Sequence, residues 1–425
     1  MLTPDIQKAY TAILREELVP ATGCTEPISL AYAAASLRET LGGIPQRILA
    51  EVSGNIVKNV KSVVVPNTGG LKGIQAAIAA GAMAGKADQG LQVISSIPKE
   101  QYPAIAAYAG SGAIRVACSD TPRLLDIRLT GWLEDHQALV HIANNHSNIV
   151  RIEKDGQVLA EKPVSDSPED GLTDKSFLNL RDILTFANEV DLSLVSQVLD
   201  RQIQCNSAIA AEGLQNSWGA NIGSTLLKEY GDDIKVEARA WAAAGSDARM
   251  SGCEMPVVII SGSGNQGMTA SLPVIRYAKK LGATQEQLYR ALLVSDLVTI
   301  YQKAGIGRLS AYCGAVSAGV GAGAGIAYLH GADFEGISQT IINAAAIISG
   351  TICDGAKPSC AAKIAAGVDA GILGYQMYRN GQAFHGGDGI LAKDADSTIA
   401  NIGVLAKQGM QETDRTILQI MTKDP

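Results

Sequence analysis

The sequence predicts an α+β protein, with an N-terminal mixed α/β domain containing an antiparallel sheet and a C-terminal all-helical domain rich in small residues. Short runs of alternating apolar and polar residues follow one another from Ile114 to Leu159, as in neighbouring strands. The polar, acidic and proline-containing segment Glu161–Ser176 then indicates an interdomain linker. Almost every later segment has helical periodicity, so we place the two domains at residues 1–175 and 176–425.

Small residues dominate the apolar content of this acidic chain. Of its 425 residues, 47% are hydrophobic, only 4% are aromatic and 45 are glycines, which suits closely packed helices. The net charge of −7 argues against general binding to nucleic acid or to an anionic membrane, because both require a basic surface. The first residues lack a charged leader followed by an apolar core, so we expect no signal peptide and a cytoplasmic protein. Seven cysteines fit a reducing compartment, with the thiols free or bound to metal.

Two predicted helices near the N-terminus flank a cysteine. Thr3–Glu17 has an apolar face of helical period, and Pro27–Leu41 follows as a second helix, since proline favours the first helical turn. Cys24 lies just before this second helix, where the positive end of the helix dipole stabilises a thiolate. We therefore take Cys24 as a catalytic candidate, and a turn cysteine without a task is the alternative.

Short strands make up most of the remaining first domain. Gln46–Ser53 alternates like a strand, Ser62–Val65 is a β-branched run, and the residues between them fit either a turn or a short helix. An alanine-rich helix ends at about Ala84. The sheet then continues with the predicted strands Ile114–Ala117, Leu125–Trp132, Leu139–Ala143 and Ile149–Glu153. A turn sequence typical of a hairpin follows the last of these strands.

Two loops rich in glycine and small polar residues precede predicted helices, so their backbone N–H groups can hold an anion. The first loop contains Asn67, Thr68, Gly69 and Gly70. The second contains Ser263, Asn265, Gln266 and Gly267. Neither has the spacing of a nucleotide-binding loop, so a small carboxylate is the ligand we consider, with a plain helix cap as the simpler explanation of the first loop. His146, in a polar loop, is a further candidate to reach a cleft, and a surface turn is the default interpretation.

The second domain is predicted to be a succession of helices. Their ranges are Phe177–Val190, Val195–Glu212, Ser217–Tyr230, Ile234–Arg249, Gln285–Tyr301, Gly314–Leu329 and Phe334–Gly350. The segment Leu309–Ala332 is long enough to span a bilayer and is free of charged residues apart from His330. Its glycines, alanines and serines make it only weakly hydrophobic, which favours a buried core helix.

Three of the seven cysteines lie close together in this helical domain. A helical hairpin would bring Cys313 back beside the turn that contains Cys353 and Cys360. Three thiolates at one point, with no fourth cysteine nearby in sequence, are typical of a metal centre with an open coordination position. The alternative is core packing, since free cysteine often fills a small apolar gap. The sequence Asp-Gly-Ala-Lys-Pro-Ser between Cys353 and Cys360 is a turn rather than core, which favours the metal centre.

Four motifs occur together in this chain: Val19–Pro27 around Cys24, Gly262–Gly267, Cys313-Gly314, and Thr351–Cys360. Together they resemble the iron–sulfur L-cysteine desulfidase family, which is similar in turn to bacterial iron–sulfur L-serine dehydratases. The resemblance runs over nearly the whole chain. It implies a carbon–sulfur lyase, L-cysteine desulfidase or cysteine desulfhydrase, that converts L-cysteine to pyruvate, ammonia and sulfide by β-elimination without pyridoxal phosphate (PLP).

By the same resemblance, Cys313, Cys353 and Cys360 bind a [4Fe–4S] cluster whose fourth iron is free to act as a Lewis acid on the leaving group. Cys24 falls where serine dehydratases carry a histidine, and the following Thr25 is shared. With a lowered pKa, Cys24 would serve as the base for the α-proton or as a resting fourth ligand. Both roles require Cys24 to lie close to the three cysteines, in a cleft between the domains.

Three other functions remain open at this point. The same cluster would serve an L-serine or L-threonine dehydratase, and the three thiolates with a water would also suit a zinc hydrolase. An iron–sulfur redox sensor is the non-enzyme alternative, although the chain has no basic patch for a DNA partner. We expect the chain to bind a small amino-acid substrate and to bind neither nucleic acid nor a membrane. A homodimer is the assembly that we consider.

Overall fold

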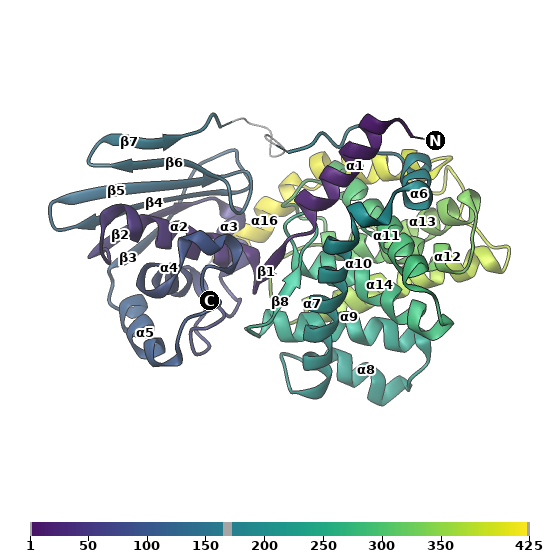
Figure 1. The fold of residues 1–425 in the computed structure, drawn as a ribbon, viewed down its shortest axis with the longest axis horizontal. Helices are drawn as coiled ribbons and strands as arrows, with labels where there is room; N and C mark the ends of the chain where they lie inside the picture. The colour runs from purple at the N-terminus through teal and green to yellow at the C-terminus, as the bar shows by residue number, and fades with distance from the viewer. Residues whose placement is uncertain (1, 165–171, 423–425) are drawn as a thin grey trace.

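The computed structural model describes residues 2–164 and 172–422 of the chain. A part built on a sheet lies beside a larger helical part, so the predicted α+β class is confirmed (Figure 1). The predicted linker Glu161–Ser176 is described at its two ends, residues 161–164 and 172–176, which lie next to the sheet part and the helical part respectively (Figure 1). Residues 165–171 lie outside the described residues. No helix in the described ranges is long and apolar enough to cross a membrane.

The sheet of the smaller part has the strand order β3-β2-β4-β5-β6-β7 in the described chain. Its strands are β2 (Arg47–Val52), β3 (Ile114–Cys118), β4 (Asp126–Leu133), β5 (His136–Ala143), β6 (Ile149–Lys154) and β7 (Gln157–Glu161). Four neighbouring pairs are antiparallel, as predicted, but β2 and β3 run parallel, with Ala50 opposite Val116. The apolar residues of alternate positions, such as Ile127 and Leu129 of β4, face one buried core.

Helices α2 (Thr25–Leu41) and α4 (Gly73–Ala84) cover the buried face of this sheet. The smaller part also contains α3 (Gly54–Val60) and α5 (Tyr102–Gly110), with short 3₁₀ turns at Ala87–Gln92 and Lys99–Gln101. The residues between the first two predicted strands form helix α3, which is one of the two alternatives that the sequence left open. One sequence prediction is corrected here: Ser62–Val65 is not a strand, because Val64 makes only an isolated bridge to Lys72.

The N-terminal helix α1 (Pro4–Glu17) packs in the core of the helical part, not in that of the sheet. Its buried Tyr10 stacks on Phe186 with ring centroids 5.1 Å apart. Strand β1 (Pro20–Thr22) then pairs antiparallel with β8 (Pro256–Val258). The chain therefore passes from the helical part to the sheet part at Gly23 and Cys24, and the first domain of the sequence-based division does not include α1 in its core.

The helical part holds the remaining elements. They are α6 (Leu180–Glu189), a 3₁₀ turn at Leu192–Leu194, α7 (Ser196–Gln215), α8 (Ile222–Tyr230), α9 (Ile234–Met250), α10 (Gly264–Leu281), α11 (Gln285–Ile306), α12 (Gly314–Leu329), α13 (Phe334–Ile348), α14 (Cys360–Arg379), α15 (Ala395–Val404), a π-helical turn at Leu405–Gly409, and α16 (Gln411–Thr422).

Small residues allow α12 and α14 to pack unusually closely. A Cβ atom added at Gly319 of α12 would lie 2.2 Å from the backbone oxygen of Gly367 in α14, a distance that real atoms do not reach. The helix predicted from the weakly hydrophobic segment is thus buried in the core, as expected. Because Cys313 immediately precedes α12 and Cys360 begins α14, this close packing brings the N-terminal ends of both helices to one place.

Candidate functional site

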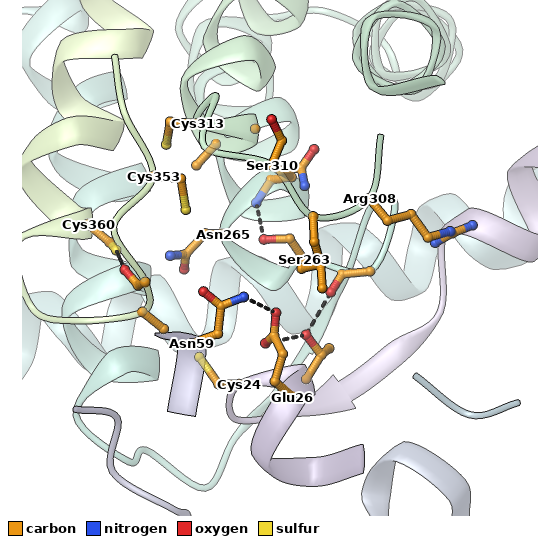
Figure 2. Close-up of a pocket in the computed structure, with 18 of the residues that line it drawn as sticks. Cys24, Glu26, Asn59, Ser263, Asn265, Arg308, Ser310, Cys313, Cys353 and Cys360 are labelled. Carbon is orange, nitrogen blue, oxygen red and sulfur yellow. Dashed lines mark hydrogen bonds between the residues drawn. The ribbon is translucent and has the colours of Figure 1, made fainter. Parts of the chain in front are cut away.

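All four cysteines of the sequence hypothesis line a single pocket between the two parts (Figure 2). The pocket has a volume of about 100 Å³. Cys24 comes from the start of α2, whereas Cys313, Cys353 and Cys360 come from the helical part. The expectation that Cys24 lies close to the other three is therefore confirmed. Polar residues of both parts complete the lining, among them Glu26, Asn59, Arg249, Ser263, Asn265, Gln266, Lys303 and Ser310.

The helical hairpin of α12 and α13 returns the chain to its starting point, as the sequence predicts. The segments on either side of the hairpin form an isolated antiparallel bridge between Tyr312 and Ile352. The amide of Cys313 donates to Thr351 O at 3.0 Å, and the amide of Cys353 donates to Ala311 O at 2.6 Å. These backbone bonds hold Cys313 and Cys353 side by side.

The loop from Cys353 to Cys360 is held against the smaller part of the molecule. Gly355 in this loop has φ of +92°, a conformation that favours glycine. A Cβ atom there would lie 2.4 Å from the backbone oxygen of Lys58, so a side chain at this position would push the loop away from α3. The contact between this loop and α3 thus determines the positions of Cys353 and Cys360 at the pocket.

The surroundings of the three thiols shift their pKa values in different directions. The interaction with Cys313 and the positive charges of Lys58 and Lys303 hold the pKa of Cys353 below its usual value. The same interaction, together with burial, raises the pKa of Cys313 well above its usual value. Burial also raises the pKa of Cys360. Of the three, Cys353 is therefore the one whose surroundings favour the thiolate.

Cys24 does not have the lowered pKa that its place before a helix suggested. Its side chain is only 2% exposed, and burial raises its pKa to about 12 in spite of the nearby Arg249. Its thiol points to the sulfur of Met250 at 3.8 Å. The desolvation of the thiolate outweighs the helix dipole here, so the expectation of a thiolate at Cys24 is corrected to a protonated thiol.

A buried carboxylate stands next to Cys24. Asn59 Nδ2 donates to Glu26 Oε1 at 3.0 Å, and Thr25 Oγ1 lies 3.1 Å from Glu26 Oε2. Burial alone would raise the pKa of Glu26, but the nearby His146 and the charge of Arg249 hold it below the usual value. The pocket therefore contains a fixed negative charge that the sequence analysis does not single out, because the burial of Glu26 depends on neighbours far away in the chain.

Lys303 of α11 contributes a buried amine to the pocket from the helical part. It is 4% exposed, and burial lowers its pKa to about 8 against the opposing effect of Cys353 and Cys313. A Cβ atom at Gly314 would lie 3.0 Å from its Nζ. The sequence gives a signal that was not used: Lys303 continues the apolar helix α11 beyond its predicted end at Tyr301, on the buried side.

The second glycine-rich loop reaches the pocket, and the first does not. Ser263, Asn265 and Gln266 line the pocket at the start of α10, where Ser263 Oγ accepts from the amide of Gln266 at 3.4 Å. Asn265 Oδ1 accepts from Arg249 Nη1 at 3.1 Å. Gly267 is absent from the lining and instead allows close packing, since a Cβ atom there would lie 2.0 Å from Val258 O.

Two other sequence candidates lie away from the pocket lining. The loop of Asn67, Thr68, Gly69 and Gly70 is not part of it. Asn67 Nδ2 donates to Ile94 O at 3.0 Å and Thr68 Oγ1 to Val65 O at 2.7 Å, so these side chains hold their own surroundings together. His146 is 2% exposed and lies behind Glu26, with Nε2 at 3.8 Å from Glu26 Oε1. The first loop therefore lies outside the lining of this pocket, and His146 is a neighbour of Glu26 and not a lining residue.

The donor set fits an iron–sulfur cluster. In the described part of the chain, no three His, Cys, Asp or Glu side chains are arranged to hold a single metal ion. A cluster instead takes its thiolates around its periphery. Cys313, Cys353 and Cys360 line one pocket, and the positive charges of Lys58, Lys303 and Lys363 act on them. Cations near thiolates favour an anionic group of this kind.

The comparisons with known proteins agree with this picture. The family model of the serine dehydratase alpha chain matches residues 88–419. A UPF0597 protein of Desulfitobacterium hafniense is 56% identical over 414 residues, covering 97% of this chain and 96% of the relative. UPF0597 proteins of Lachnoclostridium phytofermentans and Treponema denticola are 51% and 47% identical, and each covers 97% or more of both chains.

Proposed function

This chain belongs to the serine dehydratase alpha chain family of iron–sulfur lyases, and we propose that it removes the β-substituent of a small amino acid, L-cysteine, to give pyruvate, ammonia and sulfide. The observation that carries this proposal is the pocket itself, where four cysteines stand beside a buried carboxylate and a buried amine. The name of the matching family supports the second candidate, in which L-serine loses water in the same pocket.

Cys313, Cys353 and Cys360 are the residues that would hold a [4Fe–4S] cluster. When bound, such a cluster supplies a Lewis-acidic iron for the departing β-substituent. A thiolate leaving group suits the iron of a cluster better than a hydroxide does, because the thiolate is a soft ligand of the kind that iron–sulfur clusters prefer. This preference supports L-cysteine over L-serine as the substrate.

The charged side chains of the pocket suit an amino-acid zwitterion. Glu26 is an ionised carboxylate fixed by Asn59, and we assign it to the substrate α-ammonium group. The α-carboxylate is assigned to the N-terminal end of α10, where Ser263 and Gln266 offer hydrogen-bond donors and the helix dipole is positive. A substrate lacking either charged group would leave a buried charge or donor unpaired, which accounts for selection of free amino acids.

Two groups of the pocket can take the α-proton, and they make different demands. Cys24 must first lose its own proton, and its thiol is buried beside Met250. Lys303 has a lowered pKa, so its neutral amine is available at lower free-energy cost. We keep Cys24 as the candidate from the sequence and add Lys303 as the candidate from the structure. Both lie on the pocket wall, as the reaction requires.

The test of the substrate assignment is a comparison of two amino acids under one set of conditions. The chain is reconstituted anaerobically with iron and sulfide, and kcat/KM for pyruvate formation is measured with L-cysteine and with L-serine. A higher value for L-cysteine supports the desulfidase function, whereas a higher value for L-serine replaces it by the dehydratase function. A cluster-loaded protein that forms pyruvate from neither amino acid would refute both and favour the redox sensor.

A further inference from the structure

Two neighbouring residues of helix α3 (Gly54–Val60) contact different parts of the molecule. Asn59 reaches the pocket, where its Nδ2 donates to Glu26 Oε1 at 3.0 Å. Lys58 is 2% exposed and forms an ion pair with Asp414 of the C-terminal helix α16. The position of α3 therefore determines both the hydrogen bond to Glu26 and the place of a buried positive charge.

Helix α3 depends on tertiary contacts for its position. It has only seven residues, and a helix of this length is marginal by itself in water. Its N-cap Ser53 makes no capping bond to the helix, because its hydroxyl donates to Leu124 O at 2.8 Å. The contacts that hold α3 must come from elsewhere in the molecule.

Helix α16 (Gln411–Thr422) supplies several of these contacts (Figure 1). Asp414 accepts from both Lys58 and Asn55, the latter at 3.1 Å from Asn55 Nδ2 to Asp414 Oδ2. Leu418 lies so close to Gly54 that a Cβ atom there would be 2.3 Å from Leu418 Cδ2. The carboxylate of Asp414 thus binds two residues of α3 from a helix more than 350 positions away in the chain.

The same helix is anchored in the helical part next to the cysteines. Ile417 of α16, together with Met410 just before this helix, packs in one apolar cluster with Ala311 and Tyr312, the two residues before Cys313. The loop of Gly355 also rests on the backbone of Lys58. Helix α16 therefore ties α3 to the segment that carries the cluster cysteines.

We propose that Asp414 is a positioning residue, which holds α3 through Lys58 and Asn55 so that Asn59 keeps Glu26 oriented toward the substrate α-ammonium group. This inference rests on the proposed function for the role of Glu26. Removal of the Asp414 charge leaves the buried ammonium of Lys58 without its carboxylate, which is strongly unfavourable. Helix α3 then loosens, and the hydrogen bond from Asn59 to Glu26 is lost part of the time.

The test compares Asp414→Asn with Glu412→Gln, which removes an exposed charge from the same helix. Hydrogen exchange of the α3 amides is measured in the protein without cluster, and KM and kcat are measured after reconstitution. For Asp414→Asn we expect exchange at least tenfold faster and KM raised about tenfold with kcat within about twofold. Glu412→Gln should match the wild type in all three. Lys58→Met, which removes the buried cation itself, should reproduce the KM change even where Asp414→Asn fails to fold.

Unchanged α3 exchange in Asp414→Asn would overturn the proposal. Faster exchange with unchanged KM and a lower kcat would also overturn it, because a merely structural role reduces the amount of active protein without changing affinity. If the wild-type chain eliminates neither substituent, the proposed function fails, and the exchange of the α3 amides alone then decides whether Asp414 holds α3.

Discussion

Cys313 and Cys353 lie side by side, because the amide of each donates to the segment that carries the other, although a complete helical hairpin separates the two residues in the chain. These backbone bonds join the start of α12 to the loop before α14. The positive charges of Lys58 and Lys303 favour the thiolate form of Cys353 in this buried setting. The thiolate is the form in which a cysteine binds iron.

Replacement of any one of Cys313, Cys353 or Cys360 by serine is expected to abolish cluster assembly and turnover together. Two thiolates leave too few anchors for the cluster. Absorption near 400 nm after anaerobic reconstitution measures assembly, and pyruvate formation measures turnover. Cys205→Ser is the matched control, since Cys205 lies on α7 outside the pocket lining. Full activity in any of the three variants would remove that cysteine from the ligand set.

The pair of variants Cys24→Ser and Lys303→Met identifies the base. A positioned acid–base group contributes about 10²–10⁴-fold to the rate. The variant that lacks the base should lose turnover by this factor while its absorption near 400 nm is kept. The other variant should retain turnover within about tenfold. Lys279→Met, at an exposed lysine of α10, controls for loss of a positive charge. Retained turnover in Cys24→Ser would eliminate the thiol as the base.

Glu26→Gln is expected to raise KM by about 10- to 100-fold with a smaller effect on kcat. The change removes the charge that binds the α-ammonium group, and a hydrogen bond to a charged group is worth about 1.5–3 kcal/mol. Steady-state kinetics with L-cysteine measure the effect. Glu39→Gln, at the far end of α2 and exposed, is the control. A kcat loss without a KM change would assign Glu26 to proton transfer instead of substrate binding.

Asp296 makes the stability of the helical part depend on pH. Burial raises the pKa of Asp296 to about 7, above its usual value, and Gln202 Nε2 donates a hydrogen bond to Asp296 Oδ1 at 2.9 Å. The folded state therefore holds a proton that the unfolded state releases above about pH 4, so stability falls as pH rises from about 4 to 7. Asp296→Asn should flatten this dependence, which is on the order of a few kcal/mol. Urea unfolding of the cluster-free protein at pH 5 and pH 7 measures it; an equal pH dependence in both proteins would contradict the prediction.

Local sequence patterns predicted most helices and strands well. They failed where contacts between distant segments determine the position of an element or the burial of a side chain. The apolar face of α1 predicted its helix, but the pairing of Ala21 with Val257 that places α1 in the helical part has no local signal. The same limit applies to the site. Turn residues around Cys353 and Cys360 predicted a cysteine group, whereas the buried charges of Glu26 and Lys303 depend on neighbours far away in the chain. The pKa of Cys24 was misjudged because burial cannot be read from its place before a helix.

The most direct test of the central claim is an anaerobic time course of pyruvate and sulfide formed from L-cysteine by the reconstituted wild-type chain. We predict equal molar amounts of both products, formed in proportion to the absorption near 400 nm and absent from the Cys353→Ser variant. Sulfide formed without pyruvate would contradict β-elimination. Formation of both products by the Cys353→Ser variant at the wild-type rate would contradict a reaction in the pocket of the four cysteines.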